Sequence, residues 1–159
     1  MSSTIDREVA SIYHEIERML KEANNPVKQY VLEVPEDMKI PNISYSFPEV
    51  SPGMHSLSAY KKNSTLFLTV FHTNTYEAMH LAEFIVDEIS KNRNKIPLVD
   101  EDGKATKDNM RLSEFPISSK IDEGVAQVEI HYPRYPEFAK DTGEKINNYN
   151  IDLGGKYGR

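Results

Sequence analysis

The feature that most constrains this chain is a nearly uninterrupted apolar run at residues 66–71, followed at once by a helical pattern. Such a run is typical of a central strand that is covered on both faces or nearly so. Asn74, with Glu77 three residues later, has the spacing of a helix capping box. The apolar residues beyond it recur at helical spacing and predict a helix packed on that strand. They are Met79, Ala82, Ile85, Val86 and Ile89, widened by Leu81 and Phe84.

The remaining patterns predict a second helix and several strands. Residues 5–23 carry apolar side chains at steps of three and four, which predicts an amphipathic helix capped by Ser3 or Thr4. Prolines interrupt residues 35–52, so we expect an irregular connection there with short extended pieces. The expected strands are 27–34, 43–47, 55–60, 64–72, 96–99, 110–117 and 125–132, with a hairpin turn at 61–63.

These elements predict an α+β fold, in which a mostly antiparallel sheet is packed by two main helices and an extended C-terminal arm follows. We expect one domain in residues 1–133, because a chain of 159 residues leaves little room for two. Residues 134–159 are expected to form the arm, since their apolar side chains lack the periodicity of a packed element. The predicted core comprises Phe67, Val70, Ile85, Ile89, Val128 and Ile130.

Composition narrows the class of protein. The chain contains no cysteine, which excludes disulfides, thiolate nucleophiles and cysteine-bearing metal sites. Its formal net charge of −6 is unlike the basic face of a general nucleic-acid binder. No basic n-region precedes an apolar run near residue 1, and no apolar stretch reaches the ~20 residues of a membrane span. We therefore expect a soluble protein that makes no use of a membrane.

Short strings that resemble catalytic motifs fail on their context. The triplet at residues 141–143 matches an aspartic-protease sequence, but its neighbours are charged and the chain contains no second copy of it. Residues 100–103 lack the alternating ligands and the later Glu of a calcium loop. His72 and His80 could approach in space, yet the sequence supplies no clustered ligand set. We therefore expect no enzymatic activity, no cofactor and no metal.

Two features are typical of contact surfaces instead. Residues 131–136 alternate aromatic and Arg side chains with prolines, a composition enriched at protein interfaces. Residues 91–108 predict a hairpin with a charged tip, which serves either as a surface loop or as a contact finger. The candidate interface residues are Asp100, Glu101, Asp102, Lys104, Tyr132, Arg134, Tyr135, Phe138 and Tyr149.

The order of the elements resembles that of the tail terminator (tail-to-head joining) proteins of long-tailed bacteriophages. The resemblance is best over residues 55–132. Residues 66–73 look like the central strand of that family, and residues 74–85 look like the helix that follows it. The N-terminal helical pattern also suits the family, whereas residues 35–52 and the segment from Pro133 onward have no match in it.

This resemblance implies a structural role in a virion. Proteins of the family form a six-membered ring on the tail tube, stop its growth and present a surface to the head. The implied partners are further copies of the chain, the tail tube protein and a head completion or stopper protein, with genome DNA passing through the ring. The implied location is the head–tail interface of the virion, after synthesis in the host cytoplasm. The alternatives are another head–tail completion or stopper protein and, from a different class, a small cytoplasmic α+β enzyme or ligand-binding domain.

Overall fold

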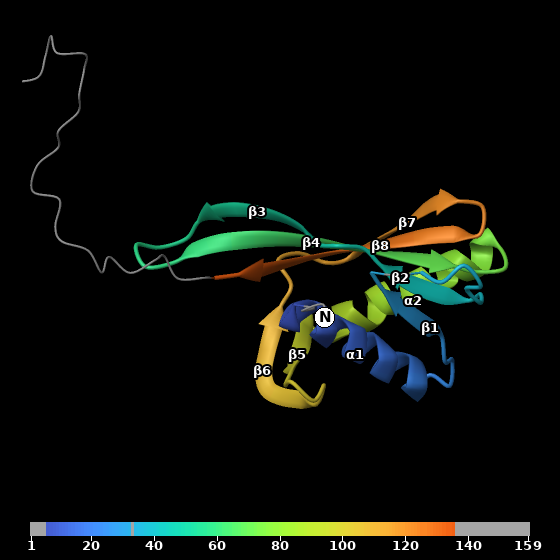
Figure 1. The fold of residues 1–159 in the computed structure, drawn as a ribbon, viewed down its shortest axis with the longest axis horizontal. Coiled ribbons are helices and arrows are strands. Elements are labelled where there is room, and N and C mark those ends of the chain that lie inside the picture. The colour runs from blue at the N-terminus through green and yellow to red at the C-terminus, as the bar shows by residue number, and fades with distance from the viewer. Residues whose placement is uncertain (1–5, 33, 136–159) are drawn as a thin grey trace, which may run out of the picture.

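The computed structural model describes residues 6–32 and 34–135, in which two helices and a small hairpin lie against one face of a mostly antiparallel sheet (Figure 1). This arrangement confirms the α+β fold predicted from the sequence. In chain order the elements are α1 (Arg7–Glu22), β1 (Lys28–Val31), β2 (Asn42–Tyr45), β3 (Glu49–Met54), β4 (Tyr60–Phe71), α2 (Thr75–Lys91), β5 (Lys95–Val99), β6 (Ala105–Arg111), β7 (Ile117–Asp122) and β8 (Val125–Arg134).

The large sheet is organised around β4. Its strands follow the order β1-β2-β4-β8-β7, and β3 pairs with β4 beyond the end of β2. Only the β1–β2 pair is parallel among these strands. Antiparallel pairing places β8 along most of β4, from Phe71 opposite Val125 to Lys62 opposite Arg134. Strands β5 and β6 form a separate two-stranded sheet.

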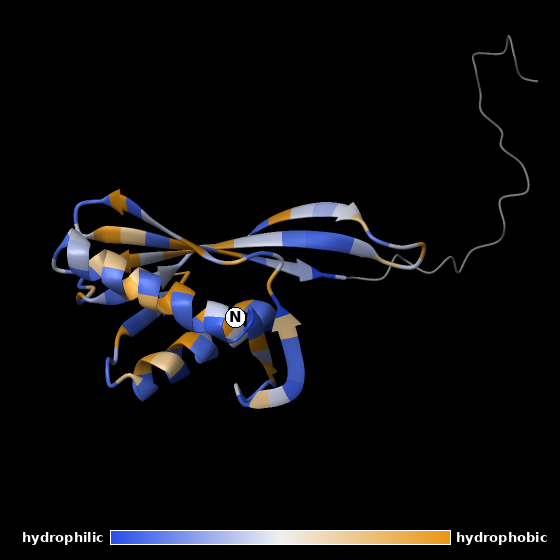
Figure 2. Cartoon of the chain, turned by 180° about the vertical axis from the view of Figure 1, so that it is seen from behind, coloured by the Kyte–Doolittle hydropathy of each residue, from blue (hydrophilic) through white to orange (hydrophobic). Residues whose placement is uncertain are grey.

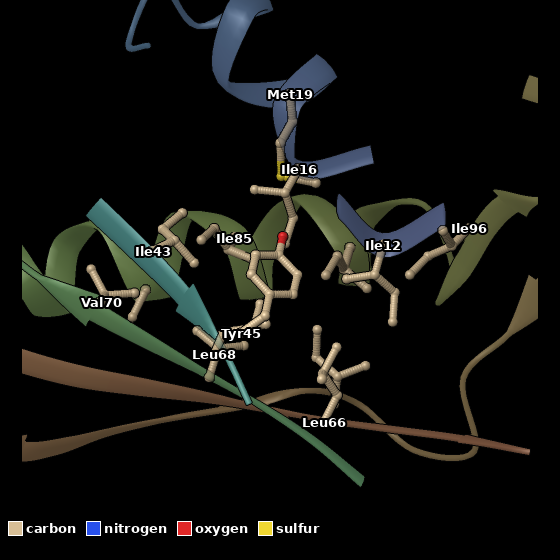
Figure 3. Close-up of a cluster of buried hydrophobic side chains, with 14 of the residues drawn as sticks. Ile12, Ile16, Met19, Ile43, Tyr45, Leu66, Leu68, Val70, Ile85 and Ile96 are labelled. Carbon is tan, nitrogen blue, oxygen red and sulfur yellow. The ribbon is translucent and has the colours of Figure 1, made fainter. Parts of the chain in front are cut away.

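The core lies between the large sheet and the two helices (Figure 3). Alternate β4 residues point into it, because successive side chains of a strand point to opposite faces. From β4 they are Leu66, Leu68 and Val70; α1 contributes Ile12, Ile16, Met19 and Leu20, and α2 contributes Leu81, Ile85 and Ile89. The sheet adds Ile43, Tyr45, Val128 and Ile130.

Five of the six predicted core residues lie in this cluster, and the prediction for Phe67 is wrong. Phe67 is half-buried on the opposite face of β4, together with Phe71. Both helices cover the same face of the sheet (Figure 1), so the central strand is fully buried on one face only. The apolar run 66–71 therefore supplies two different surfaces.

The predicted hairpin exists, but its turn lies elsewhere. Residues 61–63 are inside β4, and the connection between β3 and β4 is formed by residues 55–59. Polar residues occupy this part of β4 because it extends beyond the helices, where neither face of the strand needs to be apolar. Strand β3 also begins within the segment expected to be irregular; as an edge strand it accommodates Pro52.

The helix caps were predicted with mixed success. The side chain of Asn74 caps α2, accepting a hydrogen bond from the Glu77 amide at 2.9 Å, as the sequence predicted. Helix α1 begins at Arg7 with Asp6 at its N-cap position, so the predicted cap at Ser3 or Thr4 is wrong. The expected strand at 110–117 is likewise divided, because its first residues end β6 and its last residue begins β7.

Adjacent residues of β4 should respond very differently to truncation. Leu68→Ala removes a fully buried side chain and should lower the free energy of unfolding by about 2–5 kcal/mol. Thr69→Ala acts on the face without helices and should change it by less than about 1 kcal/mol. Urea unfolding of both variants measures the difference; equal losses would show that the two faces are assigned wrongly.

Candidate assembly surfaces

The tip of the β5–β6 hairpin is built around Asp100. Its carboxylate Oδ1 accepts hydrogen bonds from the backbone amides of Asp102 and Lys104, both at 2.9 Å. The Asp100 amide donates in turn to the Lys104 carbonyl at 2.9 Å. Asp100 therefore stabilises the turn, whereas the side chains of Glu101, Asp102 and Lys104 are exposed and available for contacts.

The hairpin packs along α1 and does not project as a finger (Figure 1). Arg7 Nε donates to the Val99 carbonyl at 2.8 Å, and the Val99 amide donates to Ser11 Oγ at 3.0 Å. Gly103 has φ +78°, and a Cβ atom there would lie 2.8 Å from His14 Nε2. A glycine is thus required at the tip both by the turn and by the close approach to α1.

The end of β8 contains three candidate residues in different settings. Tyr132 is only 1% exposed, so the structure places this residue in the core and not on a surface. Arg134 links β8 to the start of α1 through Asp6 and Glu8, each with a nitrogen–oxygen distance of 3.4 Å. Tyr135 is 51% exposed, and its ring centroid lies 4.5 Å from that of His55. The other two candidates, Phe138 and Tyr149, lie outside the described residues.

A groove of about 700 Å³ separates the end of β8 from the β5–β6 hairpin. It brings Arg134 and Tyr135 together with Glu8 and with Arg111 of β6, but the hairpin tip at 100–104 does not line it. Glu8 Oε2 is buried and has no hydrogen-bond partner among the described residues. The predicted interface residues that are exposed in the described part of the chain therefore lie on two separate surfaces, the hairpin tip and the end of β8.

His72 and His80, which the sequence left free to approach in space, line the same pocket. His72, His80 and Glu77 line one pocket of about 220 Å³ between the end of α1 and the start of α2. His72 Nδ1 accepts from the Thr73 amide at 2.8 Å. Within residues 6–32 and 34–135, no group of three or more His, Asp or Glu side chains is placed to hold a metal ion.

The groups with raised pKa values are mainly core tyrosines. Burial raises the pKa of Tyr132 to about 12, with a further contribution from the nearby Asp6 carboxylate. Burial also raises the pKa of Tyr45 well above its ordinary value, and its hydroxyl donates to Gln29 Oε1. The pKa of Tyr13 is raised by burial and by Glu17. Loss of water explains these shifts, and no substrate is needed to account for them.

Sequence reasoning missed one surface. The outer parts of β3 and β4 extend beyond the helices as a ribbon (Figures 1 and 2), which we define as residues 49–65 and name the β3–β4 ribbon. The sequence carried a signal of this surface, because the apolar residues at 50–57, which the structure exposes, are followed by two consecutive lysines at 61 and 62. The predicted turn at 61–63 concealed that residues 60–71 form one long strand, which pairs with β3.

Comparisons with known proteins connect this sequence to a phage-like element. No family model matches the sequence. The chain is 27% identical over 128 residues to the phage-like element PBSX protein XkdJ of Bacillus subtilis (strain 168), covering 80% of this chain and 86% of that protein. It is also 27% identical over 131 residues to the uncharacterized protein YqbJ of the same organism, covering 82% of this chain and 89% of YqbJ. These similarities indicate a phage-related protein. In the described part of the chain, neither helix has the length and apolarity needed to cross a membrane.

The burial of Tyr132 predicts a loss of stability at alkaline pH. An unfolded tyrosine has a pKa of about 10, so between pH 10 and about 12 the unfolded state releases a proton that folded Tyr132 keeps. This residue should therefore lower the free energy of unfolding by about 1.4 kcal/mol per pH unit in that window. Tyr132→Phe should remove the contribution, and urea unfolding at pH 7 and pH 11 measures it.

The matched control is Tyr135→Phe, a change at an exposed ring. This variant should show the same pH dependence of the free energy of unfolding as the parent chain. An equal fall in stability between pH 7 and pH 11 for the parent and for Tyr132→Phe would contradict the assignment.

Proposed function

We propose that this chain is a structural protein of a phage-type particle that acts as a tail terminator. It assembles as a ring on the tail tube, ends tube growth and joins the tail to the head. The observation that carries the proposal is the similarity to a protein of the phage-like element PBSX over 80% of the chain. The proposal also builds on the order of elements that resembles tail terminator proteins.

The geometry supports a ring subunit through its two unlike ends. Figure 1 shows the β3–β4 ribbon at one end of the molecule, and the β7–β8 turn and the start of α2 at the other. A closed ring repeats one contact between two different surfaces of each copy, so a subunit must carry a dissimilar surface at each side. The net charge of −6 suits the proposed passage of DNA, because a negative surface repels phosphates.

The proposed role is structural and not catalytic, and it requires no cofactor. Burial accounts for the pKa shifts of the tyrosines, and the acidic tip residue Asp100 is engaged by backbone amides. The proposed location is the head–tail interface of the virion. The proposed partners are other copies of the chain, the tail tube protein and a head completion protein.

Loss of the protein should produce tails that exceed their normal length. In the phage or phage-like element that encodes the chain, inactivation should give particles with overlong tails that lack heads, because tube growth is not stopped. Electron microscopy of lysates measures both features. Tails of normal length without heads would instead indicate a stopper protein, and normal particles would contradict both roles. Complementation with His72→Ala should restore normal particles, as expected if its imidazole performs no chemistry.

The proposed role of the C-terminal segment can be tested separately. Truncation should begin after Tyr135, because Arg134 belongs to β8 and pairs with Asp6 and Glu8. A chain that ends at Tyr135 should keep the folded core but fail to form rings and to join heads to tails. The reason is that the apolar residues removed, within 136–159, are proposed to contact a neighbouring copy. Its unfolding curve and negative-stain images check the two statements. Full complementation by this truncated chain would contradict a role for residues 136–159.

A further inference from the structure

The β3–β4 ribbon exposes apolar side chains where the helices give it no cover. Met54 is 86% exposed and Val50 is 49% exposed, while Leu57 at the turn is fully exposed. A hollow of about 430 Å³ beside them is lined by Pro52, Gly53, Met54 and Tyr60. An exposed patch of this kind on a projecting element is typical of a contact with another protein.

The ribbon is also positively charged in a chain that is negative as a whole. The ribbon contains Lys61 and Lys62 and a single acidic residue, Glu49 at its start, although the net charge of the chain is −6. Neither lysine forms an ion pair with any residue that the structure describes. Lys62 lies opposite Pro52 and so shares a face of the ribbon with Met54, whereas Lys61 points to the other face. An unpaired ammonium group beside an apolar patch favours a partner surface that is acidic and partly aromatic.

Helix α2 presents such a surface. Tyr76, His80, Glu83 and Asp87 are exposed at helical spacing on its outer side, which we name the α2 stripe. Residues 76–87 contain three acidic residues and neither Lys nor Arg. Tyr76 is 75% exposed, and its ring lies against that of His80 with centroids 6.1 Å apart. The stripe therefore combines negative charge with an accessible aromatic ring.

The two surfaces cannot meet within one copy. The ribbon extends from one end of the sheet, whereas α2 begins at the opposite end, beside the β7–β8 turn (Figures 1 and 2). They differ from each other, so a contact between them joins two copies head to tail. Repeating a contact of this type closes a ring if the rotation between copies divides a full turn.

We propose that the β3–β4 ribbon of one copy docks on the α2 stripe of a second copy. Lys62 pairs with Glu83 and Asp87, and Tyr76 contacts the hollow beside Met54. The sulfur and the aromatic rings supply apolar contact, and the charges set the orientation. This contact would be the contact between neighbouring subunits of the ring, so its biological role rests on the proposed function.

Charge reversal on each surface tests this contact in the full-length protein. Lys61→Glu/Lys62→Glu and Glu83→Lys/Asp87→Lys should each weaken self-association by about tenfold or more, because each change replaces attraction with repulsion. An equimolar mixture of the two variants should regain assembly, since every ribbon then faces a stripe of opposite charge. Native mass spectrometry and sedimentation at low and high salt measure the assemblies.

The matched controls reverse equal charges elsewhere. Lys28→Glu/Lys39→Glu and Glu36→Lys/Asp37→Lys change exposed residues outside both surfaces and should assemble like the parent chain. Thermal unfolding of every variant establishes that it is folded. A second pair of variants, Tyr76→Ala and Met54→Ser, should weaken assembly without changing any charge.

The outcomes separate this inference from the proposed function. Parent chains that stay monomeric or stop at a two-fold dimer would overturn the docking contact, as would folded charge variants that assemble normally or a mixture that regains nothing. If the parent forms rings that the variants leave intact, the contact is wrong while the proposed function survives. If the mixture regains assembly but particles made without the protein have normal tails, the contact stands and the proposed function fails.

Discussion

The pairing of β4 with β8 is the interaction on which the rest of this structure depends. Their register places Leu66 opposite Ile130 and Leu68 opposite Val128, so one face of two adjacent strands becomes continuously apolar. Both helices cover that face. A slip of one residue would turn these side chains to the opposite face and leave α1 and α2 with nothing to pack against. The same ladder continues past the helices and supports the β3–β4 ribbon.

Polar contacts orient the second layer on this sheet. Ser11 and Arg7 hold Val99 at the end of β5, and Arg134 reaches back from β8 to the start of α1. Inside the layer, the Tyr45 hydroxyl donates to Gln29, whose amide nitrogen donates to the Tyr13 carbonyl at 3.4 Å. Buried polar groups are costly when unpaired, so these contacts favour one placement of α1 over the many that apolar packing alone would allow.

Local patterns in the sequence predicted the elements whose surroundings are uniform. Helix α2 with its Asn74 cap and the alternation along β8 are confirmed, because one face of each is buried along its length. The prediction failed in β4, whose surroundings change from a covered half to an exposed half, so Lys61 and Lys62 resembled a turn. Candidate contacts were harder still: no local pattern reveals that the hairpin tip lies against His14 or that Tyr132 is in the core.

The position of β8 near the end of the described chain has a consequence for synthesis. All of α2, β5, β6 and β7 lie between β4 and its main partner in the sequence. While a ribosome makes these elements, one edge of β4 and its apolar face remain without β8, and unpaired apolar edges are prone to aggregate. Contacts so distant in sequence also slow folding. A nascent chain of this protein therefore depends on release of β8 from the ribosome before its central strand is protected.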